Sequence, residues 1–210
     1  MSRYVSPAGA EGQFEPGSRG RVLENLLNIT SKVEMDRAEL DALIEAQGAY
    51  YRKPRLERQR VTARFIRQMH RAWLGGVYAW AGAYRSVELM KGDFSWPPAF
   101  RVPENMARFE AEVLAEHTPC RAREVSALCR SLAIVHAELL LIHPFREGNG
   151  RLARWLADIM AFQAGSAPPE YRFTGRGARQ LRGKYLEAVS EGYVGNYEPL
   201  ERFFEEALLS

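Results

Sequence analysis

One stretch of the sequence reads His143-Pro144-Phe145-Arg146-Glu147-Gly148-Asn149-Gly150-Arg151-Leu152-Ala153-Arg154. It combines an imidazole, a carboxylate, an amide and guanidinium groups with two glycines, which permit positive φ and close approach of a ligand to the backbone. If a helix begins near Gly150, its first N–H groups and its dipole form an anion site. Arg151 and Arg154 would add forked donors on one helix face. Glu147 offers a hard oxygen for Mg²⁺ and His143 a base. These groups predict a nucleotide-polyphosphate site.

Apolar helical patterns flank this stretch on both sides. The preceding one steps by four and three residues through Leu128, Leu132, Val135, Leu139 and Ile142. Its single apolar face predicts a central helix that ends just before His143. The following pattern, which closes at Gly165, contains Leu152, Leu156, Ile159 and Met160. The stretch is therefore expected to be the loop and helix start between two core helices.

Most of the remaining chain also has helical spacing, which predicts an all-α fold. Asp36 is the expected N-cap of a helix with Leu40, Leu43 and Ile44 on its apolar face and an end near Tyr51. Further helices are predicted at 22–29, at 61–73 before Gly75-Gly76, after Pro103, at 175–193 and after Pro199. Residues 1–20 are rich in glycine and proline, so they are expected to form an N-terminal arm before one domain at 21–210.

Residues 86–96 break the helical period. Lys91-Gly92-Asp93 is a turn signal between two short arms, and a small β-hairpin is the expected structure.

Composition limits the classes of function. The chain has 210 residues, 29 basic and 26 acidic, for a net charge of +3. This balance does not favour nucleic-acid binding. Cys120 and Cys129 lack the spacing of a zinc site or a disulfide framework. The absence of a P-loop motif excludes that route to phosphate binding. Without a signal-like start or an apolar run approaching eighteen residues, the chain is expected to be cytoplasmic with no membrane contact.

The opening stretch matches the Fic family motif H-x-F-x-[DE]-G-N-G-R-x-x-R position by position. Residues 77–85, Val-Tyr-Ala-Trp-Ala-Gly-Ala-Tyr-Arg, resemble the family's Y-x-W-A-G-x-Y-R segment, and 195–200 resemble its G-[DN]-x-x-P-[LF] ending. Residues 23–39 look like a common opening of Fic domains. The resemblance covers nearly all of the chain after residue 20. It implies a Fic-type helical bundle with one small β-hairpin, the flap.

The resemblance also implies a reaction, the transfer of AMP from Mg·ATP to a Ser, Thr or Tyr hydroxyl of a target protein. His143 would be the base and Glu147 the Mg²⁺ ligand. Phosphate oxygens would be bound by Gly148, Asn149, Gly150, Arg151 and Arg154. Tyr185 and Tyr193 match positions that line the adenine pocket in Fic domains, although core packing explains them equally well. The target would bind to the flap through Leu89, Met90, Lys91, Gly92, Asp93 and Phe94.

Two other functions remain open. A Fic-fold enzyme can transfer UMP, GMP or a phosphoryl group, but the phosphorylating Doc branch has a lysine where this chain has Gly150. A catalytically silent binding module would be expected to have lost His143, Glu147 or Arg151, and all three are present.

Many Fic proteins carry an inhibitory [ST]-x-x-x-E-[GN] helix whose glutamate pairs with the second motif arginine, here Arg154. Thr30 and Glu34 have the required spacing, but Met35 departs from the pattern. A separate antitoxin-like inhibitor, or none at all, is expected instead.

Overall fold

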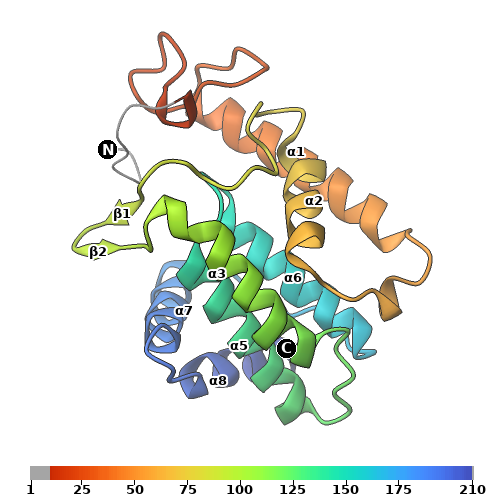
Figure 1. Cartoon of the computed structure of the whole chain (residues 1–210). Coiled ribbons are helices and arrows are strands. Elements are labelled where there is room, and N and C mark those ends of the chain that lie inside the picture. The colour runs from red at the N-terminus through yellow and green to blue at the C-terminus, as the bar shows by residue number, and fades with distance from the viewer. Residues whose placement is uncertain (1–9, 210) are drawn as a thin grey trace. The chain divides into compact units, whose positions relative to one another are not determined.

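The structure is a computed structural model that describes residues 10–209. Its helices and strands, labelled in Figure 1, are α1 (Lys32–Tyr51), α2 (Ala63–Leu74), β1 (Met90–Lys91), β2 (Phe94–Ser95), α3 (Val102–Arg108), α4 (Ala115–His117), α5 (Val125–Ile142), α6 (Asn149–Gln163), α7 (Ala178–Gly192) and α8 (Glu198–Leu208). A π-helical segment, Phe109–Leu114, joins α3 to α4. The predicted all-α class with one small hairpin is confirmed.

The chain divides into two compact units. Unit 1 contains Ala63–Ala107, Ile142–Leu152 and the described residues up to Pro54. Unit 2 contains Arg55–Thr62, Arg108–Leu141 and the described residues from Ala153 onward. The boundary expected at residue 20 between an arm and a domain stays a prediction.

In unit 1, α1 packs against α2. The buried face of α1 consists of Met35, Glu39, Leu43, Ala46 and Tyr50. The helix begins earlier than predicted, because Ser31 is its N-cap and accepts a hydrogen bond from the backbone N–H of Glu34. The expected cap, Asp36, lies inside the helix and pairs with Lys32.

Two predictions for this region are wrong. Leu43 is buried as expected, but Leu40 and Ile44, expected on the same apolar face of α1, are exposed, because the face that packs on α2 carries Met35 and Glu39 instead. The helix expected at 22–29 is not formed. There the Asn25 side chain bonds backbone groups of Leu23, Leu27 and Ile29, and such local bonds compete with a helix.

The hairpin forms where the turn signal predicted it. Met90 pairs with Ser95 and Lys91 with Phe94 in an antiparallel register. Gly92 in the turn has a φ of 58°, a conformation that glycine adopts without strain.

The two core helices that flank the motif are also confirmed. By length and composition α5 would suffice to cross a membrane, although Arg130 and Glu138 keep it from being one continuous apolar run. However, 56% of that segment is buried inside the protein, as expected of the core helix of a bundle. Composition alone therefore does not indicate a membrane span.

In unit 2, α7 packs against α8. The structure begins α7 at Ala178 rather than near Gly175, after Gly177 in a left-handed conformation. Pro199 lies in the first turn of α8, as predicted, where its missing N–H leaves no bond unmade.

Candidate active site

The motif loop lies in unit 1, between the end of α5 and the start of α6. Gly148 has a φ of 86°, and a Cβ there would lie 2.8 Å from the Trp73 ring. Glycine is therefore required at this position for both conformation and space. His143 also has positive φ, 51°, which is strained for a residue with a side chain. Such a conformation persists only where neighbouring groups fix it.

Arg85 fixes the backbone around His143. The Arg85 side chain is fully buried, and its Nε donates to the His143 carbonyl at 2.7 Å. The same guanidinium donates to the carbonyls of Val87 at 3.0 Å and Pro97 at 2.6 Å. In addition, the Arg85 backbone N–H donates to the Pro144 carbonyl at 2.9 Å. One side chain thus joins the motif loop to both ends of the hairpin segment.

The root of the hairpin packs on the predicted base. The Trp96 ring lies 4.1 Å from the imidazole of His143, centroid to centroid. Trp96 belongs to a buried cluster with Val87 and Leu89. Its backbone N–H donates to the Leu89 carbonyl at 3.1 Å. Among the predicted flap residues, Leu89 is therefore part of the core, while Met90 and Phe94 are exposed.

His70, on the buried face of α2, holds the backbone of Glu147. Its Nδ1 accepts from the Gly82 N–H at 2.8 Å, so Nε2 carries the proton and donates to the Glu147 carbonyl at 3.1 Å. Burial lowers the pKa of His70 to about 4, which keeps the ring neutral near pH 7. The ring stacks on Phe145 at 3.9 Å, and Phe145 is fully buried, so it anchors the motif loop in the core.

The Glu147 carboxylate suits the role of a magnesium ligand. It is 20% exposed, and its Oε1 accepts from the Gly148 N–H at 3.1 Å. Among the described residues no group of three or more potential ligands gathers elsewhere. One carboxylate completed by phosphate oxygens is a usual magnesium arrangement. The residues present therefore fit this ion when nucleotide supplies the remaining ligands.

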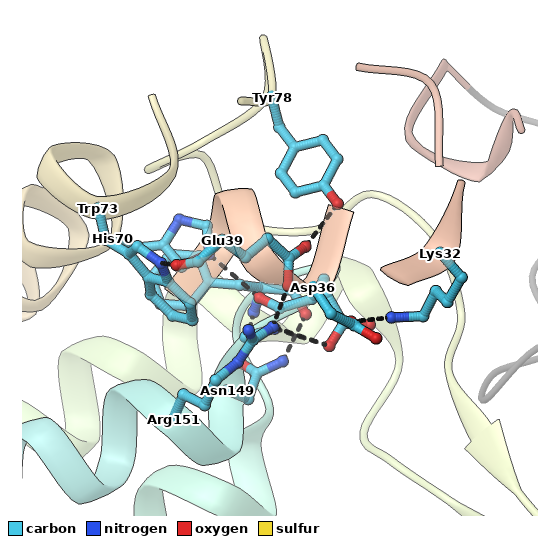
Figure 2. A network of polar contacts seen from close by, with 11 residues as sticks. Lys32, Asp36, Glu39, His70, Trp73, Tyr78, Asn149 and Arg151 are labelled. Atoms are coloured by element: carbon cyan, nitrogen blue, oxygen red, sulfur yellow. Dashed lines mark hydrogen bonds and ion pairs between the residues drawn. The ribbon is translucent and has the colours of Figure 1, made fainter. Parts of the chain in front are cut away.

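Arg151, in the first turn of α6, is held by a buried carboxylate. Figure 2 shows the guanidinium reaching Glu39, whose Oε2 lies 2.6 Å from Nη2. The other Glu39 oxygen accepts from the Tyr78 hydroxyl at 2.6 Å. The Glu39 carbonyl accepts from the Trp73 indole at 2.8 Å, and the Trp73 ring lies 4.7 Å from the Arg151 guanidinium carbon.

The Asn149 side chain has a role that the motif did not predict. Its Oδ1 accepts from the Phe145 N–H at 3.0 Å, and its Nδ2 donates to the Phe145 carbonyl at 2.7 Å. Asn149 thus ties the loop to the first turn of α6, which begins one residue before the expected start at Gly150. A phosphate contact by the second N–H of Nδ2 stays a prediction.

The second motif arginine, Arg154, belongs to unit 2 and has aromatic neighbours there. Its guanidinium carbon lies 5.7 Å from the Tyr171 ring centroid and 5.3 Å from that of Phe173. The Tyr171 hydroxyl donates to Asp158 at 3.0 Å. Burial raises the pKa of Asp158 to about 7, although the Tyr171 hydrogen bond and the charge of Arg154 act in the opposite direction.

The two tyrosines predicted for the adenine pocket also lie in unit 2. Tyr185 is buried among Phe173 and Phe203, and its hydroxyl lies 2.7 Å from Nε2 of His136. Tyr193 lies just after α7, and its hydroxyl donates to the Leu140 carbonyl at 3.4 Å. These contacts give both residues a packing role, and their contact with adenine stays a prediction.

Sequence reasoning missed the groups that support the motif from α1, α2 and the loop after α2. Glu39 and His70 each lie at helical spacing among buried apolar residues. A polar group on such a face needs a partner, and this was the available signal. Arg85 ends the segment that resembles Y-x-W-A-G-x-Y-R. The aromatic residues of that segment pack on each other, with Tyr78 stacked on Trp80 at 4.5 Å.

Comparisons with known proteins identify a family. Residues 60–161 match the family model described as Fic/DOC family. The chain is 29% identical over 148 residues to protein adenylyltransferase VbhT of Bartonella schoenbuchensis, covering 69% of this chain but 30% of that protein. It is 28% identical over 187 residues to the probable protein adenylyltransferase y4lH of Sinorhizobium fredii, covering 88% of this chain and 89% of that protein.

A solved structure supports the fold. BepC from Bartonella tribocorum, crystallised with bound AMPPNP, superposes with a TM-score of 0.70 at 17% identity, covering 88% of this chain and 91% of that one. At this identity the likeness establishes the fold alone, and the Fic-type helical bundle expected from the motif is thereby confirmed. The motif, the family-model match and these relatives lead to the same conclusion: the chain contains a Fic/DOC family domain.

Proposed function

We propose that the protein transfers AMP from Mg·ATP to a Ser, Thr or Tyr hydroxyl of a target protein. The observation that carries this proposal is the placement of a base, a carboxylate and a guanidinium in one motif loop of unit 1. His143, Glu147 and Arg151 lie between the end of α5 and the first turn of α6. The names of the relatives, protein adenylyltransferases, support it. So does the AMPPNP bound to BepC, since it is an ATP analogue.

The chemistry follows from these groups. His143 takes the proton of the target hydroxyl as its oxygen attacks the α-phosphorus of ATP. The bond from that phosphorus to the bridging oxygen breaks, and pyrophosphate leaves. Glu147 holds the Mg²⁺ that offsets the charge on the phosphates. The first-turn N–H groups of α6 and the guanidinium of Arg151 bind phosphate oxygens, as preorganised donors do in oxyanion holes. Arg154 binds the far end of the triphosphate.

The predicted flap would bind the target. Met90 and Phe94 are 39% and 40% exposed, and each has a backbone edge on a two-stranded ribbon. An extended target segment can add to such an edge through main-chain hydrogen bonds. Because Trp96 at the root of the hairpin contacts His143, a segment bound there would place its hydroxyl near the base.

The test is label transfer to a lysate from each α-³²P-labelled NTP, with Mg²⁺ present. ATP is expected to label a protein band, and mass spectrometry of that band identifies the target. His143→Ala is the control and should lower the rate at least about 10²-fold. Transfer from γ-³²P-ATP with no α-label would replace the proposal with phosphorylation. Labelling only from UTP or GTP would change the nucleotide, and no label in any lane would favour a silent binding module.

We propose that no internal glutamate inhibits the site, which leaves inhibition to a separate antitoxin-like protein or to none at all. Glu34 is exposed in the first turn of α1, and its sequence context departs from the inhibitory motif at Met35. Glu34→Gly is therefore expected to leave auto-adenylylation nearly unchanged. Wild-type and variant rates are compared with α-³²P-ATP at equal protein concentration. A tenfold or larger increase would identify Glu34 as an internal inhibitor.

A further inference from the structure

The Glu39–Arg151 pair lies largely out of solvent, unlike most ion pairs among residues 10–209. The Glu39 side chain is 4% exposed and the Arg151 side chain 28%. Lys32 and Asp36, which pair on the same helix α1, are 53% and 57% exposed. Exposed pairs contribute little, whereas a carboxylate removed from water requires its partner. Glu39 and Arg151 therefore depend on each other.

The Glu39 carboxylate is itself held in place. Tyr78 donates its hydroxyl to Oε1 at 2.6 Å while Arg151 bonds Oε2, so both oxygens have partners (Figure 2). Burial and the negative charge of Glu39 raise the pKa of the Tyr78 hydroxyl, which keeps it protonated as a donor. A carboxylate fixed at both oxygens presents Oε2 in one direction.

Arg151 is then fixed on two sides. Glu39 occupies one end of the guanidinium, at Nη2, and the Trp73 ring covers one face at 4.7 Å. The same Nη2 lies 3.9 Å from Oε1 of Glu147, beyond hydrogen-bond distance. A guanidinium has five N–H donors in a plane, so one end can be occupied while others point elsewhere. Arginine has many rotamers in solution, and holding one of them in advance reduces the ordering that ligand binding requires.

We propose that Glu39 is the positioning residue of the phosphate site: its buried carboxylate, clamped by Tyr78, orients the Arg151 guanidinium for the polyphosphate of the nucleotide. The inference rests on the proposed function in that Arg151 is taken to bind nucleotide phosphate. Glu39 itself touches no phosphate. Its role differs from that of an inhibitory glutamate, because the carboxylate leaves the remaining donors of Arg151 to the ligand.

The test measures binding of Mg·AMPPNP to the full chain by calorimetry, a readout that needs no transfer. Glu39→Gln keeps the shape of the side chain but removes its charge and replaces one carboxylate oxygen with an NH₂ group that faces Arg151 or Tyr78. It is expected to raise the Kd about tenfold, the low end of losses seen when a supporting partner is removed. Asp41→Asn is the matched control, because Asp41 pairs with Arg37 on the exposed face of the same helix. That variant should bind like the wild type.

Kinetics separate positioning from loss of structure. Glu39→Gln should raise KM for ATP about tenfold and change kcat less than about threefold, since His143 and Glu147 are untouched. Glu39→Asp, which retains the charge, should recover part of the affinity. Should Glu39→Gln fail to fold, Tyr78→Phe takes its place. That variant keeps the carboxylate but frees one of its oxygens, and about a threefold higher Kd is expected.

A Kd for Glu39→Gln, or for Tyr78→Phe in its place, within twofold of wild type would overturn the inference. Faster transfer by Glu39→Gln would also overturn it and make Glu39 an inhibitor. No binding of Mg·AMPPNP by the wild type would overturn it as well. A wild type that binds nucleotide but transfers no AMP would reject the proposed function alone.

Discussion

Arg151 and Arg154 belong to the same helix, α6, and the motif assigns both to phosphate, yet different kinds of group hold them. Arg151 pairs with the buried carboxylate of Glu39 at 2.6 Å in unit 1. Arg154 lies beside the rings of Tyr171 and Phe173 in unit 2. A carboxylate fixes the direction of a guanidinium but offsets its charge. Aromatic faces attract the cation and leave its charge in place.

Arg154 keeps more of its charge than Arg151 even though Asp158 is nearby. Burial raises its pKa to about 7, so near neutral pH a large fraction of it is uncharged and offsets Arg154 only in part. The two arginines therefore differ in what their surroundings do to them: Arg151 is held in a fixed direction, and Arg154 keeps more of its charge.

The largest expected difference between the two sites is in stability. Arg151→Ala leaves Glu39 buried without its cation, and we expect the free energy of unfolding to fall by about 2–3 kcal/mol, less than for a fully buried pair. Arg154→Ala removes cation–π contacts and should cost about 1 kcal/mol. Urea denaturation at pH 7.5 measures both. Arg37→Ala, which breaks an exposed pair on α1, is the control and should change little. Equal losses at Arg151 and Arg154 would contradict the comparison.

The next effect is a pH dependence confined to the Arg154 site. In the unfolded chain Asp158 ionises near its ordinary pKa of 3.8, but in the folded protein only near 7. Between these values the folded state binds more protons, so this group makes the protein less stable as pH rises through that range, with no further change above it. Asp158→Asn cannot titrate. Its stability relative to wild type should therefore increase from pH 5 to pH 7, by roughly 2 kcal/mol.

A second buried group, His136, also changes stability with pH in this series. Burial lowers the pKa of His136 to about 3, so this residue removes stability as pH falls below about 6.5, the opposite trend. Because His136 is present in both proteins, its contribution cancels in the difference between Asp158→Asn and wild type. A difference that does not vary with pH would show that Asp158 titrates normally.

The smallest effect concerns the aromatic contacts themselves. Phe173→Leu removes one ring beside Arg154 while keeping an apolar side chain, and about 0.5–1 kcal/mol of stability should be lost. The loss should be smaller in an Arg154→Ala background, because only the contacts of Phe173 with other rings such as Tyr185 and Phe203 then remain. A double-mutant cycle by urea denaturation measures the difference. An equal loss in both backgrounds would mean that Phe173 contributes only packing.

The sequence predicted the motif loop, the central helix and the hairpin, because each is encoded by local spacing. Asn149 and Glu39 show where local spacing was insufficient. The motif identified Asn149, but its bonds to Phe145 depend on the curvature of the loop in three dimensions. Glu39 lies far from the motif along the chain, and only tertiary packing within unit 1 brings it to its partner Arg151. The wrong apolar face for α1 has the same origin, since Leu40 and Ile44 carry no local mark of being exposed.

The Arg85 clamp has a consequence for engineering. Because one guanidinium bonds the carbonyls of His143, Val87 and Pro97, the ends of the hairpin segment and the catalytic loop share a fixed support. The tip at Lys91–Asp93 is exposed and takes no part in that support. New tip sequences could therefore be grafted onto the hairpin without disturbing the hydrogen bonds that hold the backbone of His143.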